Sequence, residues 1–214
     1  MTPPADTVTP ATPPGAAEAF GARLPLAVAY VGLLAEVATV RGLIGPREVP
    51  RLWERHVLSS AAVAAVIPDH AAVLDVGSGA GLPGIPLALA RPDLNLTLAE
   101  PLLRRATFLD EACRALHLTS VRVVRARAEQ LPRRSTDVVT ARAVAPLPRL
   151  LTWTLPLLRP GGLLVAIKGR TAQDELTAAE ADLQRLRAAS WAVREIPVPG
   201  STDTTRAVLV VAGR

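Results

Sequence analysis

The most constraining feature of the sequence is an apolar run that leads directly into a glycine-rich loop. Residues 73–84 read Val-Leu-Asp-Val-Gly-Ser-Gly-Ala-Gly-Leu-Pro-Gly. The apolar residues predict a buried strand, and Gly77, Gly79 and Gly81 let the backbone turn sharply and approach a ligand closely. The ligand would lie outside the carboxyl end of the sheet. A tight strand–helix turn without a ligand would use the same glycines, so the loop alone does not decide the function.

After Pro68, short apolar runs alternate with helical segments, which predicts an α/β fold. We expect strands at residues 71–76, 94–99, 121–126, 137–141, 162–168, 191–198 and 206–212. We expect helices from the glycine loop to Ala90 and at residues 102–116, 147–158 and 172–189. This alternation favours a mostly parallel seven-stranded sheet with helices on both faces. The last two strands have no helix between them and should pair antiparallel.

The N-terminal part is expected to form a tail and a helical cap. Residues 1–16 contain five prolines and no basic residue, which predicts a disordered tail. The apolar run 24–35 is too short to span a bilayer and starts too late for a signal peptide. We expect a helical cap at 17–67, a main domain at 68–214, no membrane association and a cytoplasmic location. The buried face of the first cap helix should carry Leu26, Tyr30, Leu33, Leu34 and Val37.

The chain is strongly basic, with 24 basic and 19 acidic residues, a net charge of +5 and a pI of about 10.8. Lys168 is the only lysine. Arginine suits phosphate groups and guanine edges, so a polyanionic partner is one reading and a solvated basic surface is the other. The candidate phosphate contacts are Arg47, Arg51 and Arg55 on one face of a helix at 47–66, and Arg122, Arg125, Arg133 and Arg134.

Two carboxylates flank the expected ligand. Asp75 ends the strand before the glycine loop, where it can orient the loop or meet a ligand amine. Glu100 follows Gly79 by 21 residues and ends the next strand, where a carboxylate can accept both hydroxyls of a ribose. Dinucleotide enzymes share this acid, but an acidic loop disfavours a diphosphate. The arrangement therefore favours S-adenosylmethionine, which is cationic and carries no phosphate.

Two further loops should border the ligand. The loop Arg127-Ala128-Glu129 follows the third strand, where a backbone N–H and a carboxylate can read an adenine edge; a surface turn is the alternative. The loop 140–146 follows the fourth strand and faces the transferred methyl group, and Arg142 is its only charged residue. An arginine at this place favours a functional role over a structural one.

The acceptor is inferred by elimination. The loop after the fourth strand lacks the Asn/Asp-Pro-Pro-aromatic run typical of amino-group methyltransferases. Cys113, the only cysteine, lies mid-helix, and His56, His70 and His117 occupy separate segments without metal-ligand spacing, so we expect no metal. The elimination leaves an acceptor that needs no deprotonation. Guanine N7 fits, because it has a free lone pair and catalysis then requires mainly positioning and desolvation.

Four segments carry a resemblance to a known family: Arg41–Glu48, Leu52–Ser59, Leu74–Pro86 and Ala141–Ala143. They resemble the RsmG (GidB) family of 16S ribosomal RNA guanine-N7 methyltransferases, and the Gly-Leu-Pro-Gly-Ile-Pro extension of the glycine loop is specific to that family. The resemblance implies a Rossmann-like class I methyltransferase fold with an N-terminal helical cap. It also implies S-adenosylmethionine as donor and, as acceptor, a guanine in the decoding-region loop of 16S rRNA.

The resemblance also implies roles for individual residues. The positions expected to line the cofactor are Gly77, Leu82, Ala128, Glu129 and Arg142, with Glu100 on the ribose and Asp75 and Gly79 in the loop. Arg127 and Arg206 match positions that look like RNA or guanine contacts, so Arg127, Arg142 and Arg206 are the candidate substrate-positioning residues. The expected partner is 16S rRNA or the 30S particle, and the expected state is a monomer.

Two alternatives stay open. A small-molecule methyltransferase could use the same fold, and an apolar lid over the cleft would favour it; we find no inserted lid in the sequence. A non-catalytic binding module is the other alternative. The intact glycine loop together with Glu100 argues against this alternative, because a protein that had lost its catalytic site would have no physical need of both.

Overall fold

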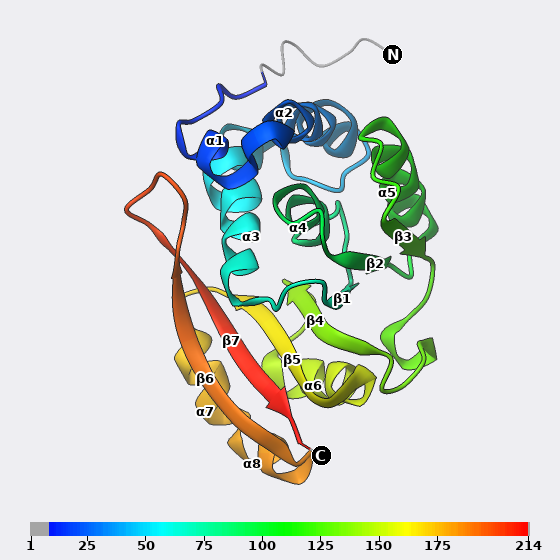
Figure 1. Cartoon of the computed structure of the whole chain (residues 1–214), viewed down its shortest axis with the longest axis vertical. Coiled ribbons are helices and arrows are strands. Elements are labelled where there is room, and N and C mark those ends of the chain that lie inside the picture. Colours follow the sequence, from blue (N-terminus) through cyan, green and yellow to red (C-terminus); the bar gives the residue numbers. More distant parts are fainter. Residues whose placement is uncertain (1–8, 214) are drawn as a thin grey trace.

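The structure is a computed structural model that describes residues 9–213 of the chain. Within these residues the core is one seven-stranded sheet in the order β3-β2-β1-β4-β5-β7-β6 (Figure 1). The strands are β1 (Ala72–Val76), β2 (Asn95–Ala99), β3 (Val121–Val124), β4 (Thr136–Arg142), β5 (Leu158–Lys168), β6 (Ala188–Pro197) and β7 (Thr204–Ala212).

Strand directions follow from the connections. Strands β1 to β5 pair in parallel, because a helical crossover separates each from the next along the sheet. Strand β7 pairs antiparallel with both β5 and β6, and a short turn joins β6 to β7. The predicted fold and all seven strands are confirmed. The boundaries differ: β3 ends at Val124 instead of 126, and β5 and β6 begin earlier than predicted, at Leu158 and Ala188.

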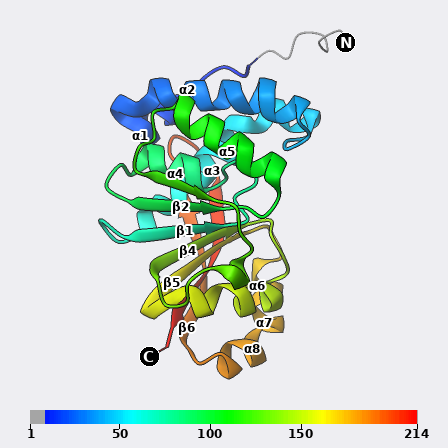
Figure 2. The same ribbon diagram turned by 90° about the vertical axis from the view of Figure 1, so that its right-hand side faces the viewer.

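Helices cover both faces of the sheet (Figure 2). One face packs against α4 (Gly84–Ala90), α5 (Leu103–Ala115) and the N-terminal cap, in a core that includes Ile85 and Phe108. The other face packs against α6 (Leu147–Thr154), α7 (Ala172–Ala178) and α8 (Glu180–Arg185). The single helix predicted at 172–189 is thus two shorter helices that end at Arg185.

The cap consists of short helices with irregular turns. Its α-helices are α1 (Gly15–Phe20), α2 (Leu24–Leu33) and α3 (Ser59–Ala62). Two π-helical stretches, Leu34–Ala38 and Leu52–Leu58, and a 3₁₀ turn, Pro46–Arg51, lie between them. Since a 3₁₀ turn has only about three residues per turn, side chains four residues apart within Pro46–Arg51 no longer share one face.

The start of the chain differs from the predicted tail. Residues 1–8 of that tail lie outside the described part of the chain. Further on, helix α1 begins at Gly15, Ala16 is fully buried, and the Trp53 indole N–H donates to the Pro10 carbonyl at 3.2 Å. The reason is packing, because a segment rich in proline and alanine can still bury small side chains against the cap.

The run Gly15–Ala38 is long and apolar enough, by length and composition, to cross a membrane, but core helices of soluble proteins meet the same criterion. In this protein Tyr30 and Leu34 are fully buried in the core, as predicted. Leu26, Leu33 and Val37 are only half-buried. The buried face is centred instead on small and β-branched residues, namely Ala27, Val31, Ala35 and Ala38.

The cap is joined to the glycine loop by one buried hydrogen bond. The Tyr30 hydroxyl donates to the Ala80 carbonyl at 2.8 Å. The pKa of Tyr30 is raised well above its usual value, mainly because the side chain is buried. The hydroxyl therefore stays protonated and keeps its donor role at neutral pH.

We expect Tyr30→Phe to lower the free energy of unfolding by about 1–2 kcal/mol, because the buried Ala80 carbonyl loses its donor. Urea denaturation measures the change. Thr177→Val, which removes a hydroxyl from an exposed position, is the control and should leave the midpoint where it is. Equal midpoints for Tyr30→Phe and the wild type would show that the bond contributes nothing.

Candidate active site

The glycine loop leaves the carboxyl end of β1 in a conformation that suits glycine. Gly77 has φ +68°, and a Cβ there would lie 2.8 Å from Cγ2 of Val144 in the loop after β4. The loop at Gly77 therefore approaches the β4 loop too closely for any side chain.

Asp75 lies beneath this loop and is fully buried. Its Oδ2 accepts from the Ser78 hydroxyl at 2.5 Å and from the Gly84 backbone N–H at 3.1 Å, and its Oδ1 accepts from the Thr140 hydroxyl at 2.9 Å. Burial raises the pKa of Asp75 to about 6, although the three hydrogen bonds oppose the shift. The sequence left two roles open for Asp75, to orient the loop or to contact a ligand amine. These hydrogen bonds favour the first role, because they orient the loop.

Glu100 follows β2, as predicted, and its carboxylate also holds the loop. Oε2 accepts from the Gly79 N–H and Oε1 from the Leu102 N–H, both at 3.0 Å, while Arg105 Nη1 lies 4.0 Å from Oε2. Glu100 is only 2 % exposed. A carboxylate has about four acceptor sites, so each oxygen retains a lone pair for a ligand hydroxyl.

A cavity of about 180 Å³ opens at the carboxyl ends of β1 to β3. Its lining brings together four of the predicted site residues: Gly77, Arg127, Ala128 and Glu129. It also includes Trp153 of α6, which sequence reasoning missed because an aromatic residue in an apolar helix looks like ordinary core. Leu82, also predicted, is buried and is not part of this lining.

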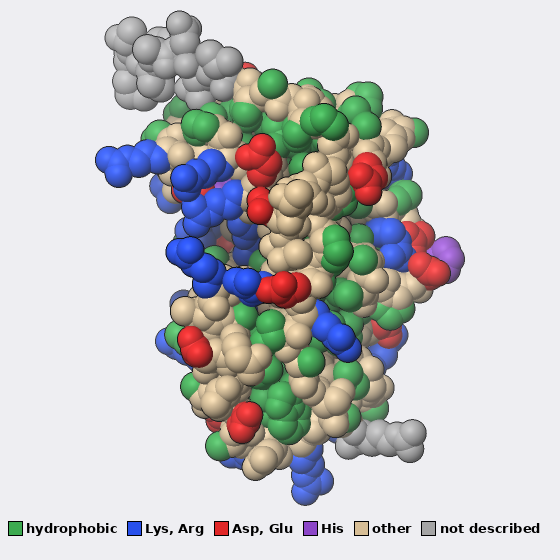
Figure 3. Space-filling model, turned by 90° about the vertical axis from the view of Figure 1, so that its left-hand side faces the viewer, with side chains coloured by type: hydrophobic (Ala, Val, Ile, Leu, Met, Phe, Trp, Pro, Cys, Tyr) green, Lys and Arg blue, Asp and Glu red, His purple; other side chains and the backbone are tan. Residues whose placement is uncertain are grey.

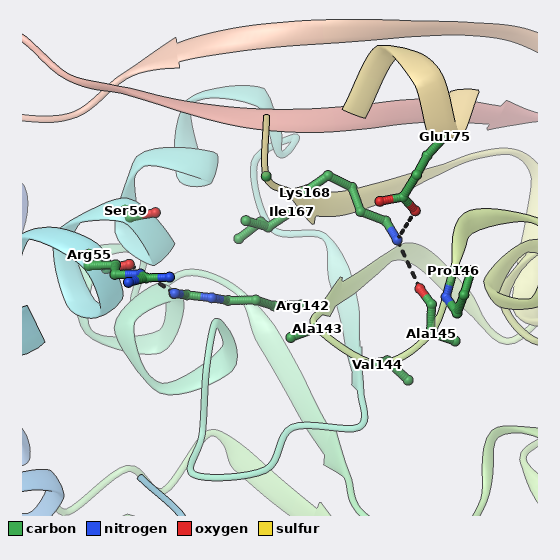
Figure 4. Close-up of a pocket in the computed structure, with 11 residues that line it drawn as sticks. Arg55, Ser59, Arg142, Ala143, Val144, Ala145, Pro146, Ile167, Lys168 and Glu175 are labelled. Carbon is green, nitrogen blue, oxygen red and sulfur yellow. Dashed lines mark hydrogen bonds and ion pairs between the residues drawn. The ribbon is translucent and has the colours of Figure 1, made fainter. Parts of the chain in front are cut away.

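A second, larger cavity of about 760 Å³ lies at the ends of β4 and β5 (Figure 4). It is lined by Arg142 and by the loop that follows it, and by Lys168 and Glu175 on the opposite wall. Val144 lines both cavities, so the two adjoin at this side chain. The predicted site residues are thus divided between adjoining spaces, with Arg142 in the larger.

Arg142 extends from the end of β4 into the cap, and its guanidinium is hydrogen-bonded there. Nη1 donates to the His56 carbonyl at 3.1 Å and to the Ser60 hydroxyl at 2.9 Å. Nη2 donates to the Arg55 carbonyl at 2.8 Å and lies 2.9 Å from Nδ1 of His56. Burial lowers the pKa of Arg142 to about 10, so the group keeps its charge at neutral pH.

Lys168 is the functional candidate that sequence reasoning missed. Its side chain is 10 % exposed, and its Nζ donates to the Ala145 carbonyl at 2.8 Å and to Glu175 at 2.7 Å. The ammonium thereby fixes the loop between Arg142 and Pro146 from the facing strand. The available signal was its position, because the only lysine in an arginine-rich chain ends a core strand.

A groove of about 510 Å³ continues from the larger cavity, and the two share Arg55 and Ser59. Arg51 and Arg206 also line it, and Arg206 pairs with Glu195 at 2.7 Å. Figure 3 shows basic side chains gathered around a hollow on the corresponding face of the molecule. Arg47 is not in the lining, because the 3₁₀ turn rotates it away from the predicted stripe.

The four arginines of the other predicted basic cluster do not lie together. Arg122 lies in β3 and Arg125 directly follows that strand. Arg133 and Arg134 line a cavity of about 260 Å³ together with Arg187. This cavity lies where β4 and β5 begin and β7 ends, so it is at the opposite end of the strands from the glycine loop. These arginines are therefore remote from the two adjoining cavities and the groove.

Cys113 and the three histidines line none of the cavities described above. Cys113 is buried in α5, and burial raises the pKa of its thiol to about 12, so the thiol stays protonated. Within residues 9–213, no group of three His, Cys, Asp or Glu side chains is arranged to hold a metal ion.

A glycine loop, a carboxylate after β2 and an antiparallel β7 define the S-adenosylmethionine-dependent methyltransferases of class I. The fold is similar to a SAM-dependent O-methyltransferase from Thermotoga maritima, with a TM-score of 0.58 and 15% identity over 78% of this chain and 70% of that chain.

Sequence comparison defines the family. The profile of the GidB family, described as rRNA small subunit methyltransferase G, matches residues 23–198. Ribosomal RNA small subunit methyltransferase G of Thermobifida fusca is 58% identical over 80% of this chain and 73% of the relative. Its counterpart from Streptomyces coelicolor is 56% identical over 87% and 79%. The chain therefore belongs to the rRNA small subunit methyltransferase G family, and the predicted family and cofactor are confirmed.

We expect the stability of the wild type relative to Asp75→Asn to depend on pH. The folded pKa of Asp75 is raised to about 6, so its stabilising contribution is complete below the unfolded value near 3.9 and is lost as pH rises through 6. The wild-type free energy of unfolding, less that of the variant, should fall by about 2–3 kcal/mol between pH 4 and pH 7.

Denaturant titrations at several pH values measure this difference. Asn is the matched substitution, because its carbonyl can face Gly84 while its amide donates to Thr140. A difference that does not change with pH would contradict the buried, hydrogen-bonded carboxyl group.

Proposed function

We propose that this protein transfers the methyl group of S-adenosylmethionine to N7 of a guanine in the decoding-region loop of 16S rRNA. The observation that carries the proposal is the adjoining pair of cavities that meet at Val144, the larger of which continues into an arginine-lined groove. A donor in the smaller cavity and an acceptor base in the larger one would meet at that side chain. Three arginines and two carboxylates, Glu54 and Asp203, line the groove, and this excess of positive charge favours a polyanionic acceptor over a small molecule.

The smaller cavity and the loop above Asp75 would hold the donor. Gly77 and Ala128 leave room beside the adenosine, Glu129 and the Ala128 N–H border its base edge, and Glu100 accepts from the ribose hydroxyls. When bound, S-adenosylmethionine supplies an electrophilic methyl group on a sulfonium. Asp75 contributes indirectly by holding the loop, since its oxygens face Ser78, Gly84 and Thr140.

Arginine side chains would position the base that accepts the methyl group. The four Nη hydrogens of Arg142 are directed at the cap, so its Nε–H and its charge would act on the base in the larger cavity. Arg127 lines the smaller cavity and would donate to guanine O6 or a neighbouring phosphate across Val144, and Arg206 lies on the groove that leads to the larger cavity. Guanine N7 has a lone pair and no proton to lose. The side chains therefore need only align the base and exclude water, and no general base is required.

The groove that contains Arg51, Arg55 and Arg206 would follow the RNA backbone on either side of the target base. We infer that the protein acts as a cytoplasmic monomer on 16S rRNA or the 30S particle, without a metal. The names of its relatives as rRNA methyltransferases support this location and substrate.

The direct test is methyl transfer from labelled S-adenosylmethionine to small-subunit RNA, naked or in 30S particles, followed by mapping of the modified base. Label at N7 of one guanine is the expected result. Transfer to small acceptors alone, with RNA unlabelled, would favour the small-molecule alternative and contradict the proposal.

We expect the single-turnover rate to be nearly constant between pH 7 and pH 8.5, because no proton is removed from N7 and Arg142 keeps its charge. Arg142→Ala should reduce this rate about tenfold or more while changing cofactor affinity little. Rapid-quench kinetics on saturated 30S particles, with calorimetry for the cofactor, measure both. A rise of about tenfold across this pH range would indicate a deprotonated acceptor, such as an exocyclic amine or a hydroxyl.

We expect the triple variant Arg51→Gln, Arg55→Gln, Arg206→Gln to bind RNA with a weaker salt dependence. Loss of three phosphate contacts should reduce the slope of log K against log salt by about 2. The charge-matched control is Arg133→Gln, Arg134→Gln, Arg187→Gln at the opposite end of the strands, which should leave the slope as in the wild type. Equal slopes for both variants would assign the groove to solvated surface.

A further inference from the structure

His56 lies between an acidic residue and the arginine of the larger cavity. Its Nε2 is 2.7 Å from Oε2 of Glu48, and its Nδ1 is 2.9 Å from Nη2 of Arg142. The imidazole is 12 % exposed and sits in the π-helical turn Leu52–Leu58, whose carbonyls at positions 55 and 56 also bind Arg142. The three side chains form a continuous chain from the cap to the end of β4.

The partners of the ring define where its proton lies. A guanidinium has only N–H donors, so Nδ1 must be an unprotonated acceptor toward Arg142. The remaining proton is then on Nε2, where it can be donated to Glu48. Only the neutral Nε2–H tautomer satisfies both neighbours, since the other tautomer and the imidazolium each place a hydrogen between Nδ1 and Arg142.

We infer that His56 is a positioning residue for methyl transfer: Glu48 holds its ring as the Nε2–H tautomer, and Nδ1 accepts from Arg142 and fixes the plane of that guanidinium. The inference rests on the proposed function of Arg142 toward the acceptor. The Arg55 and His56 carbonyls and the Ser60 hydroxyl fix where the guanidinium lies. The ring nitrogen is the one acceptor in this set, among the described residues, that a single protonation can convert to a donor.

The charges around the ring favour its neutral form. The charged groups that face it are Glu48 from the 3₁₀ turn, Arg55 from its own turn and Arg142 from β4. Burial, followed by the charge of Arg142, lowers the pKa of His56 below its ordinary value, while Glu48 opposes the shift. Protonation of Nδ1, as the pH falls below the usual histidine range, therefore removes one of the four acceptors of Arg142 and the constraint on its plane, while the two carbonyls and the Ser60 hydroxyl still hold the group in place.

Two substitutions separate the ring's two hydrogen bonds. In His56→Asn, the amide oxygen can occupy the place of Nδ1 and accept from Arg142, while the contact to Glu48 is lost. In His56→Gln, the longer amide reaches the place of Nε2 and Glu48, and the acceptor for Arg142 is lost. A residue that served only to fill space would respond similarly to both changes, so the pair is a matched test of the acceptor.

The tautomer is measured independently of activity by a two-bond ¹H–¹⁵N correlation spectrum of the full chain at pH 7. The signals of His56 are assigned by their loss in His56→Gln, since the chain has only three histidines. The Nε2–H tautomer is the expected result. An Nδ1–H tautomer or an imidazolium at pH 7 would overturn the inference.

The kinetic arm uses single-turnover methylation of 30S particles. We expect His56→Gln to lower the rate about tenfold at neutral pH with unchanged cofactor affinity, the effect of one hydrogen bond to a charged group. His56→Asn should restore most of the rate and, unlike the wild type, show no decline below pH 6.5. Equal rates for the two variants, or an acid decline retained in His56→Asn, would overturn the inference. Failure of the wild type to methylate RNA would instead contradict the proposed function, and the spectrum would still decide the tautomer.

Discussion

The arrangement of the site depends on one buried carboxylate. Asp75 receives hydrogen bonds from Ser78 in the glycine loop, from Gly84 at the start of α4 and from Thr140 in β4. It thus joins three elements at the point where the sheet opens toward its ligand. Burial of a carboxylate is costly, and the raised pKa reflects that cost, but three donors directed at two oxygens offset it and leave few alternative loop conformations.

The position of the loop in turn determines how the two cavities meet. Because Gly77 packs directly against Val144, the β1 loop and the β4 loop share a wall, and one side chain borders both the donor and the acceptor space. The β4 loop is held at both ends. Arg142 anchors its start to the cap, and Lys168 anchors Ala145 to β5. The cap is therefore a structural part of the site, as the Tyr30 contact to Ala80 also indicates.

The features that sequence could predict depend on local rules. The apolar runs define the strands, because a strand covered by helices on both faces is apolar along its length, and the glycine loop is recognisable because glycine tolerates the turn at Gly77. The predicted face of Arg47, Arg51 and Arg55 failed at Arg47, because the 3₁₀ turn changes the helical period there and the local sequence does not distinguish that turn from an α-helix. The partners of Arg142 could not be foreseen either, since they come from residues about 86 positions away.

The chemistry proposed for the site agrees with how its carboxylates are used. Asp75 accepts three hydrogen bonds, Glu100 accepts two loop N–H groups and keeps lone pairs for a ligand hydroxyl, and Glu175 accepts from Lys168 and from the Leu147 N–H. Such groups hold positions, whereas a general base must be free to take a proton from the substrate. A reaction at guanine N7 requires no such base. The carboxylates nearest the β4 loop, Asp75 and Glu175, are thus engaged in hydrogen bonds, and Arg142 keeps its charge. Such a site suits an acceptor that arrives with its lone pair exposed, and its catalytic contribution is the alignment of two bound groups.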